Sequence, residues 1–397
     1  MIDVASSRGG RARARAERRS ATLSSLQALD WVLLAAVGTL IAYGLWAIAG
    51  ITRFDVEGDK NYYVVRQAVA AGIGVVGLVA ALLVDPEVYR RSKRLLYAGT
   101  TGLMLLVFAL GEAARGSTRW LDLGFFQFQP SEFGKLLYAL ALAGFIADRV
   151  RKVPDGRTVL ATIGLGAIPV LLVFAQPDLG TGMVYSSALA ALLFFGGARL
   201  THLLALAAVL AAVLVGVLWF LPSKGVEVLK PYQTARLTGF TNPERDPAGL
   251  TYNVSQSITA VGSGGLDGRG VRGATQTRLN YLPEHATDFV FASFAEQRGF
   301  FGAAILLFLY ALVVWRGLRV VTVAQDVFSA MVAGSIVAAF LFQVFVNVGM
   351  TMGIAPVTGI PLPFVSVGGS SMVANLLAIG VLQAIHTRAG GLRRRAR

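Results

Sequence analysis

Apolar runs of about 20 residues recur along the whole chain and alternate with shorter polar stretches. A helix of that length crosses a hydrocarbon core of about 30 Å. The pattern therefore predicts an all-α polytopic membrane protein. About ten spans are expected, near residues 27–49, 64–84, 95–111, 132–147, 158–175, 183–198, 202–221, 300–315, 327–349 and 371–387.

Composition supports this class. Hydrophobic residues make up 55% of the 397 residues and charged residues only 15%, whereas soluble domains carry about a quarter charged residues. The chain has no cysteine, which excludes disulfides and cysteine metal sites.

The charge distribution predicts the orientation. An even number of spans puts both termini on one side, and Lys and Arg concentrate on the cytoplasmic side. The side of the termini receives 22 of the 36 basic residues and 8 of the 22 acidic ones, so it carries the whole net charge of +14. We therefore expect two disordered, basic cytoplasmic tails, residues 1–26 and 388–397, flanking a membrane domain, 27–387. Because the charge follows topology, no nucleic-acid partner is expected, and the tails are expected to rest on anionic lipid.

The longest polar insert, residues 222–299, then lies outside the cytoplasm. No nucleoside triphosphates are available there, so a synthetic reaction needs a substrate that carries its own leaving group. Six glycines lie between residues 262 and 273. They could form an anion-binding nest of backbone N–H groups or a flexible connection.

The insert includes the sequence YLPEHATDF, residues 281–289. We expect Pro283 to begin a helical turn that places Glu284 and Asp288 on one face, with His285 three residues before Asp288. This group could act as a general base, hold a cation or cap the next span.

Two further motifs place polar residues at membrane depth. Pro130 is expected to open a helix with Glu132 in its first turn and Lys135 on the same face, after a segment that includes Arg119. An internal ion pair at a capped helix start explains this pattern, and so does a charged cavity, because charges inside spans usually face one. In QPDLGTG, residues 176–182, Asp178 is expected to cap the following helix.

The stretch GIAPVTGIPLPFVSVGGSSM, residues 353–372, has three prolines. Irregular backbone at membrane depth persists only when protein buries it or when it lines a cavity. We therefore expect a re-entrant segment beside a substrate groove, ending at Ser370 and Ser371.

Together, STRW…QPSEFGK, QPDLGTG, NPERDPAG…QSITAVGSGGLDGRG…YLPEHATDFVFA and PVTGIPLPFVSVGGSSM resemble the SEDS family (shape, elongation, division and sporulation) over residues 30–387. Within that family, NPERDP and GATQTRLNYLPEHATDF look more like RodA than FtsW.

The resemblance implies a peptidoglycan glycosyltransferase that polymerises lipid II at the outer face of the cytoplasmic membrane. It implies Asp288 as the catalytic acid of the TDF motif. Divalent Mg or Mn could assist, with ligands not assigned. The implied partners are a class B penicillin-binding protein and the other membrane proteins of the elongation complex. The substrate-binding residues expected are Arg119, Glu132, Lys135, Asp178, Ser370 and Ser371.

Two positions depart from the family pattern. Val367 stands where an aromatic residue is more usual, and His285 is displaced by one residue from the position just before Thr-Asp-Phe. The second departure weakens a role for His285 beside Asp288. Two alternative functions stay open, a septal polymerase of the FtsW type and a flippase for a lipid-linked precursor.

Overall fold

The computed structural model describes residues 28–110, 112–114, 117–122, 127–153, 155–226, 234 and 251–395. The N-terminal tail expected at 1–26 lies outside the described residues. The expectation of a disordered tail at 388–397 is wrong for residues 388–395, which continue helix α17 (Gly369–Arg395). Ten long helices account for most of the described chain. They are α2 (Trp31–Ile51), α3 (Tyr62–Leu83), α5 (Lys93–Leu110), α6 (Pro130–Ala147), α7 (Gly156–Ala175), α8 (Leu179–Phe195), α9 (Leu200–Val215), α15 (Val290–Val323), α16 (Val327–Thr351) and α17 (Gly369–Arg395).

The helices confirm the expected polytopic membrane fold. Eight are long and apolar enough to cross a membrane, with α9 counted together with the π-helical turn Gly216–Phe220 and α10 (Leu221–Ser223). Helix α8 is apolar but has 17 residues. Helix α6 has 18 residues and carries Glu132 and Lys135 near its start. These two helices lie at the other two expected spans, so that ten long helices, eight of them candidate membrane spans, stand where ten spans were expected.

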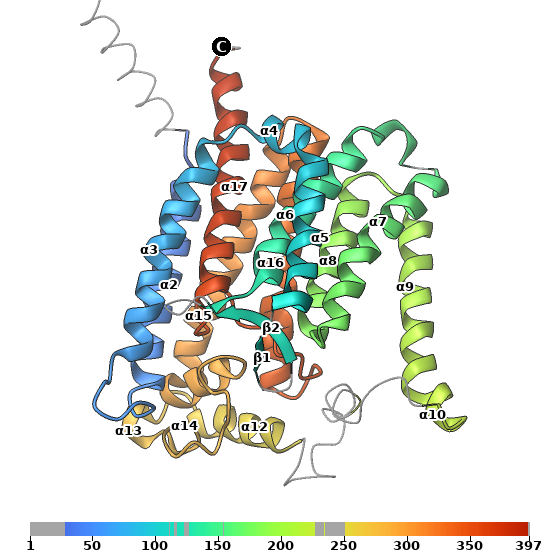
Figure 1. The fold of residues 1–397 in the computed structure, drawn as a ribbon. Helices are drawn as coiled ribbons and strands as arrows, with labels where there is room; N and C mark the ends of the chain where they lie inside the picture. Colours follow the sequence, from blue (N-terminus) through green and yellow to red (C-terminus); the bar gives the residue numbers. More distant parts are fainter. Residues whose placement is uncertain are drawn as a thin grey trace, which may run out of the picture.

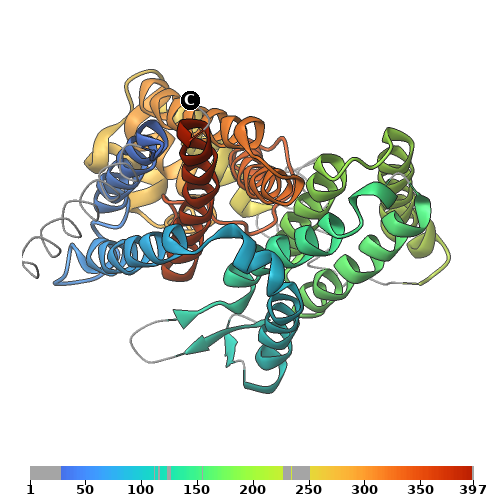
Figure 2. The ribbon, with the colours of Figure 1, turned by 90° about the horizontal axis from the view of Figure 1, so that it is seen from above.

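Shorter elements connect the long helices. Helix α4 (Pro86–Arg91) and a 3₁₀ turn (Val150–Lys152) lie at one end of the bundle. The segment before α6 forms a small antiparallel sheet in the order β1 (Glu112–Ala114), β2 (Ser117–Asp122), β3 (Gln127–Phe128). The sheet was not predicted. It projects beside the bundle in Figure 2.

Figure 1 shows the two-ended organisation of the molecule. The C-terminal end of α17 and α4 lie at one end, and α12 (Tyr252–Gly264), α13 (Gly270–Gly273) and α14 (Thr275–Arg278) cover the other. Helix α9 stands at the edge, and none of its residues is buried. The acid-bearing motif and the predicted cytoplasmic end therefore lie at opposite ends of the bundle.

A buried ion pair joins three helices at the α4 end. Asp30 caps α2 by accepting a hydrogen bond from Leu33 N, and it receives Arg316 Nη2 of α15 at 2.7 Å. Gln383 of α17 exchanges two hydrogen bonds of 3.0 Å with the backbone of Asp30. The polar groups at this buried helix start are thereby paired, as burial requires.

The polar insert ends earlier than expected. Helix α15 begins at Val290, so residues 290–298 belong to a helix and not to the loop. Gly299 kinks this helix with φ 65° and ψ −165°. At the kink, backbone N–H groups of Phe300 and Phe301 donate to Gly265 O and Leu266 O at 2.9 and 3.2 Å. At the kink these two N–H groups thus bind carbonyl groups of the glycine-rich stretch, which lies outside the helix.

Close packing explains two of these six glycines. A Cβ on Gly264 would lie 2.1 Å from Ala295 O, and one on Gly268 would lie 2.4 Å from Gln297 O. Residues 252–264 are helical. At Gly264 and Gly268 the stretch therefore packs against α15 at close range, while the anion nest and the flexible connection stay predictions.

Candidate active site

Asp288 lies in an irregular loop that directly precedes α15. Residues 283–289 form turns, and Glu284 has a φ of 54°. The prediction that Glu284 and Asp288 share one helical face is therefore wrong. The Glu284 carboxylate instead accepts a hydrogen bond from Thr287 Oγ1 at 2.9 Å within the loop.

Three successive carbonyl groups fix this loop. Ala286 O accepts from Val367 N at 2.9 Å, and Thr287 O accepts from Ser366 Oγ at 2.6 Å. Asp288 O accepts from Asn347 Nδ2 at 2.8 Å. Every donor belongs to α16 or to the proline-rich segment that follows it, so the loop conformation depends on residues distant in the sequence.

The proline-rich segment, residues 353–368, is irregular, as predicted, and half of its residues are buried. Ser366 Oγ also accepts from Leu362 N at 2.8 Å. Gln67 of α3 donates to Ser366 O and accepts from Gly368 N, at 2.9 and 3.1 Å. These contacts satisfy backbone groups that no helix or sheet pairs.

Gly359 of this segment faces the Asp288 carboxylate. It has a φ of 72°, and a Cβ built on it would lie 3.3 Å from Asp288 Oδ2. Positive φ and close approach both favour glycine here. The absent side chain leaves space next to the carboxylate.

His285 links the loop to another part of the chain. Its Nε2 lies 3.0 Å from Asp55 Oδ2, and its Nδ1 lies 3.1 Å from Leu282 O. Asp55 belongs to the connection between α2 and α3. His285 therefore links the loop to the connection between α2 and α3.

Glu132 and Lys135 form the predicted ion pair. Lys135 Nζ donates to Glu132 Oε2 at 2.8 Å and to Gln343 Oε1 of α16 at 3.1 Å. The side chains are 2% and 12% exposed for Glu132 and Lys135. All three line a cavity of about 50 Å³ that lies between α6, α8, α15, α16 and α17. Both earlier interpretations thus hold, because the pair stabilises a helix start and also faces a cavity.

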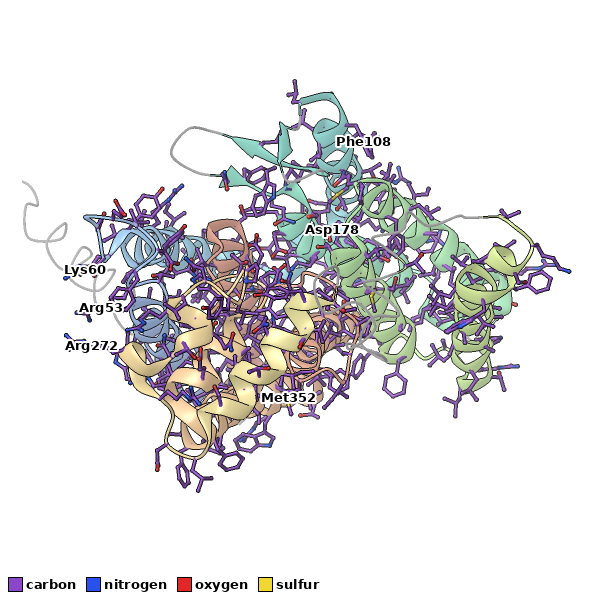
Figure 3. The ribbon with its side chains drawn as sticks, turned by 90° about the horizontal axis from the view of Figure 1, so that it is seen from below. Arg53, Lys60, Phe108, Asp178, Arg272 and Met352 are labelled. Carbon is purple, nitrogen blue, oxygen red and sulfur yellow. The ribbon has the colours of Figure 1, made fainter. Side chains whose placement is uncertain are left out.

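Asp178 caps α8, as predicted, by accepting from Thr181 N at 3.0 Å. Its Oδ2 also lies 3.4 Å from Gln129 Nε2. Figure 3, which views the end that carries α12–α14, shows Asp178 near the centre, whereas Arg53, Lys60 and Arg272 lie at one edge. Asp178 is 3% exposed, so its contacts position α6 and α8.

Ser370, like Asp178, is buried and contacts the segment before α6. Its hydroxyl donates to Gln127 O at 2.8 Å and accepts from Gln129 N at 3.0 Å. Ser371 Oγ accepts from Asn375 Nδ2 at 3.2 Å. Arg119 lies in β2, and its side chain is outside the described residues. Direct contact of these four predicted residues with substrate stays a prediction.

Sequence reasoning missed Asn347, Gln343, Gln67 and Asp55. The first two had a readable signal, because polar amides inside the apolar run 327–349 face protein or a cavity in preference to lipid. Among the described residues, no group of three or more His, Asp or Glu could hold a metal ion. The chemistry proposed below uses no step through the expected Mg or Mn.

These features define a class, a polytopic helical membrane protein with an ion pair facing an internal cavity and, at one end, an acid-bearing loop whose carbonyl groups are held by α16 and the proline-rich segment. The chain belongs to the FtsW, RodA and SpoVE family, whose model, described as "Cell cycle protein", matches residues 25–390.

Curated relatives include the peptidoglycan glycosyltransferase MrdB of Escherichia coli (strain K12), 38% identical over 88% of this chain and 92% of that protein. Stage V sporulation protein E of Bacillus subtilis (strain 168) is 36% identical over 88% of this chain and 93% of that protein. The probable peptidoglycan glycosyltransferase FtsW of Thiomicrospira cyclica is 34% identical over 90% and 91%.

Solved structures are similar over the same range. A chain from a peptidoglycan synthase complex, described as coordinating polymerization and crosslinking, has a TM-score of 0.76 at 29% identity and covers 91% of this chain and 98% of that one. The rod shape determining protein RodA of Thermus thermophilus has a TM-score of 0.66 at 26% identity, covering 90% and 96%.

Proposed function

We propose that this chain is a peptidoglycan glycosyltransferase that polymerises lipid II during cell elongation, with Asp288 as the general base. The observation that carries the assignment is the clamped Asp288 loop, whose carboxylate faces Gly359. Family membership and relatives named peptidoglycan glycosyltransferase support it. Lipid II carries its own pyrophosphate leaving group and lipid anchor, which suits a reaction outside the cytoplasm.

In this reaction the Asp288 carboxylate removes the proton from the 4-hydroxyl of the acceptor sugar. The oxygen attacks the anomeric carbon of the growing chain, and the bond to undecaprenyl pyrophosphate breaks with inversion. One base suffices because pyrophosphate leaves without protonation, unlike the sugar oxygen in a hydrolase with two carboxylates. Lys135 and Arg119 neutralise the charge that develops on the pyrophosphate.

We propose that both termini are cytoplasmic and that α12–α14 lie on the extracytoplasmic side. The basic residues at the end opposite to these helices support this orientation. The chain lacks cysteine, so single cysteines at Gly262 and at Arg91 report it cleanly. Only the first is expected to react with an impermeant maleimide added to intact cells.

A class B penicillin-binding protein is the proposed partner. The similarity to a chain from a complex that coordinates polymerization and crosslinking supports it. Co-purification of this chain with such a transpeptidase tests it.

The central test is Asp288→Asn, which keeps the size of the side chain and removes the base. The purified variant is expected to insert and fold and to lose about 10²–10⁴ in the rate of glycan synthesis from lipid II. Retention of the wild-type rate would sink the assignment. Detergent-solubilised wild-type protein distinguishes a flippase, which makes no product without a membrane, from a polymerase. A septal role predicts that depletion blocks division and leaves elongation intact.

A further inference from the structure

Asn347 contacts the backbone of the proposed base itself. Its side chain is fully buried, and Nδ2 donates to Asp288 O and to Ile360 O, each at 2.8 Å. Ile360 directly follows Gly359, which faces the Asp288 carboxylate. One amide group therefore joins the residue that carries the base to the segment that shapes its surroundings.

Gln343 lies one helical turn before Asn347, on the same face of α16. Its Oε1 accepts from Lys135 Nζ at 3.1 Å. The rise between the two positions is about 6 Å along the helix axis. Helix α16 thus carries two amide side chains one turn apart. Gln343 contacts Lys135 in the cavity, and Asn347 contacts the loop that carries Asp288.

We infer that Asn347 is a positioning residue. Through α16, which contacts both residues, it keeps the distance between Asp288 and Lys135 constant. This inference rests on the proposed function of Asp288. In the transfer reaction a base must meet the acceptor hydroxyl while a cation meets the pyrophosphate, so their separation must match the substrate. Asp288 and Lys135 come from different segments, and α16 is the element that contacts both.

The other two hydrogen bonds that hold the loop do not replace this contact. Ser366 Oγ and Val367 N bind Thr287 O and Ala286 O, the carbonyls before the base. Asn347 is the side chain that binds the carbonyl of Asp288. Loss of this bond leaves the two preceding carbonyl contacts in place and removes the link between Asp288 and α16.

The test compares Asn347→Leu with Gln383→Leu in the purified full chain, using lipid II as substrate. Gln383 is an equally buried amide, but it lies in the middle of α17 and makes both of its hydrogen bonds to the backbone of Asp30, which caps α2. Both variants are expected to melt at a lower temperature. Asn347→Leu alone is expected to lower kcat, by about 10²-fold as for a base displaced by about 1 Å, with KM within about twofold of wild type.

Should Asn347→Leu fail to accumulate in membranes, Asn347→Ser, which keeps one short donor, is expected to lower kcat less with the same unchanged KM. Equal kcat for Asn347→Leu and Gln383→Leu would overturn the inference, and so would a raised KM with unchanged kcat. Failure of the proposed function is distinguishable, because Asp288→Asn would then retain activity. If the inference alone fails, Asp288→Asn is inactive while the Asn347 variants keep wild-type kcat.

Discussion

The imidazole of His285 and the carboxylate of Asp55 lie 3.0 Å apart, although 230 residues separate them in the chain. The two side chains are only 11% and 15% exposed. The contact joins the α2–α3 connection to the loop that carries Asp288. A histidine displaced from its family position therefore serves as an anchor for the motif.

Replacing Asp55 by Asn should loosen this anchor. A hydrogen bond to a charged group contributes about 1.5–3 kcal/mol, so the variant is expected to melt at a lower temperature and to synthesise glycan more slowly. Glu57→Gln is the control, because Glu57 is exposed in the same connection. The double variant Asp55→Asn, His285→Gln should be no worse than either single one. Additive losses would show that the two residues act independently.

Lys135→Met removes the cation of the cavity and leaves Glu132 buried without it. Removing one partner of a buried pair costs about 3–5 kcal/mol, and losing an electrostatic stabiliser costs about 10²–10³ in rate. Adding Glu132→Gln is expected to restore thermal stability without restoring activity. A doubly substituted protein with wild-type polymerisation would rule out the role of Lys135 in neutralising pyrophosphate.

Gly359→Ala should crowd the base. The added Cβ would lie 3.3 Å from Asp288 Oδ2, at a residue with φ 72°. The matched control is Gly58→Ala, which has φ 83° and no atom within 4 Å of the added Cβ. Both variants carry similar backbone strain, of about 1 kcal/mol or more. Only Gly359→Ala is expected to lower kcat, and equal activity of the two variants would contradict the contact with the carboxylate.

The connection after α6 should show a defined pH dependence. The hydrogen bond from Lys93, assisted by Arg90, lowers the pKa of Asp148 below its ordinary value of 3.8. The contribution of Asp148 to stability is therefore present above about pH 4 and is lost as the pH falls through the lowered pKa. Melting curves of wild type and Asp148→Asn should differ at pH 6 and converge under strongly acidic conditions. A difference that grows on acidification would reverse the predicted sign.

The sequence was most informative where a local rule governs the structure. Apolar run lengths predict the spans, and Pro130 and Asp178 mark helix starts that the structure confirms. The spacing of Glu132 and Lys135 predicts their ion pair, because residues three apart share a helix face. The prolines of residues 353–372 predict irregular buried backbone for a similarly local reason.

Local rules failed where distant segments control the backbone. The helical turn expected at Pro283 is absent, because the loop uses its carbonyls to accept from Asn347, Ser366 and Val367. Gly264 and Gly268 pack closely against α15, which no spacing within the loop reveals. Ser370 is buried against β3, a contact that no local spacing predicts.

The sequence by itself thus determined the membrane class, the family and the candidate base in YLPEHATDF. The tertiary structure decided how that base is held. The partners of His285 and of the Asp288 carbonyl come from α2–α3 and α16, respectively. A hydrogen bond depends on distance in space, and a helical bundle brings together residues that no sequence period relates.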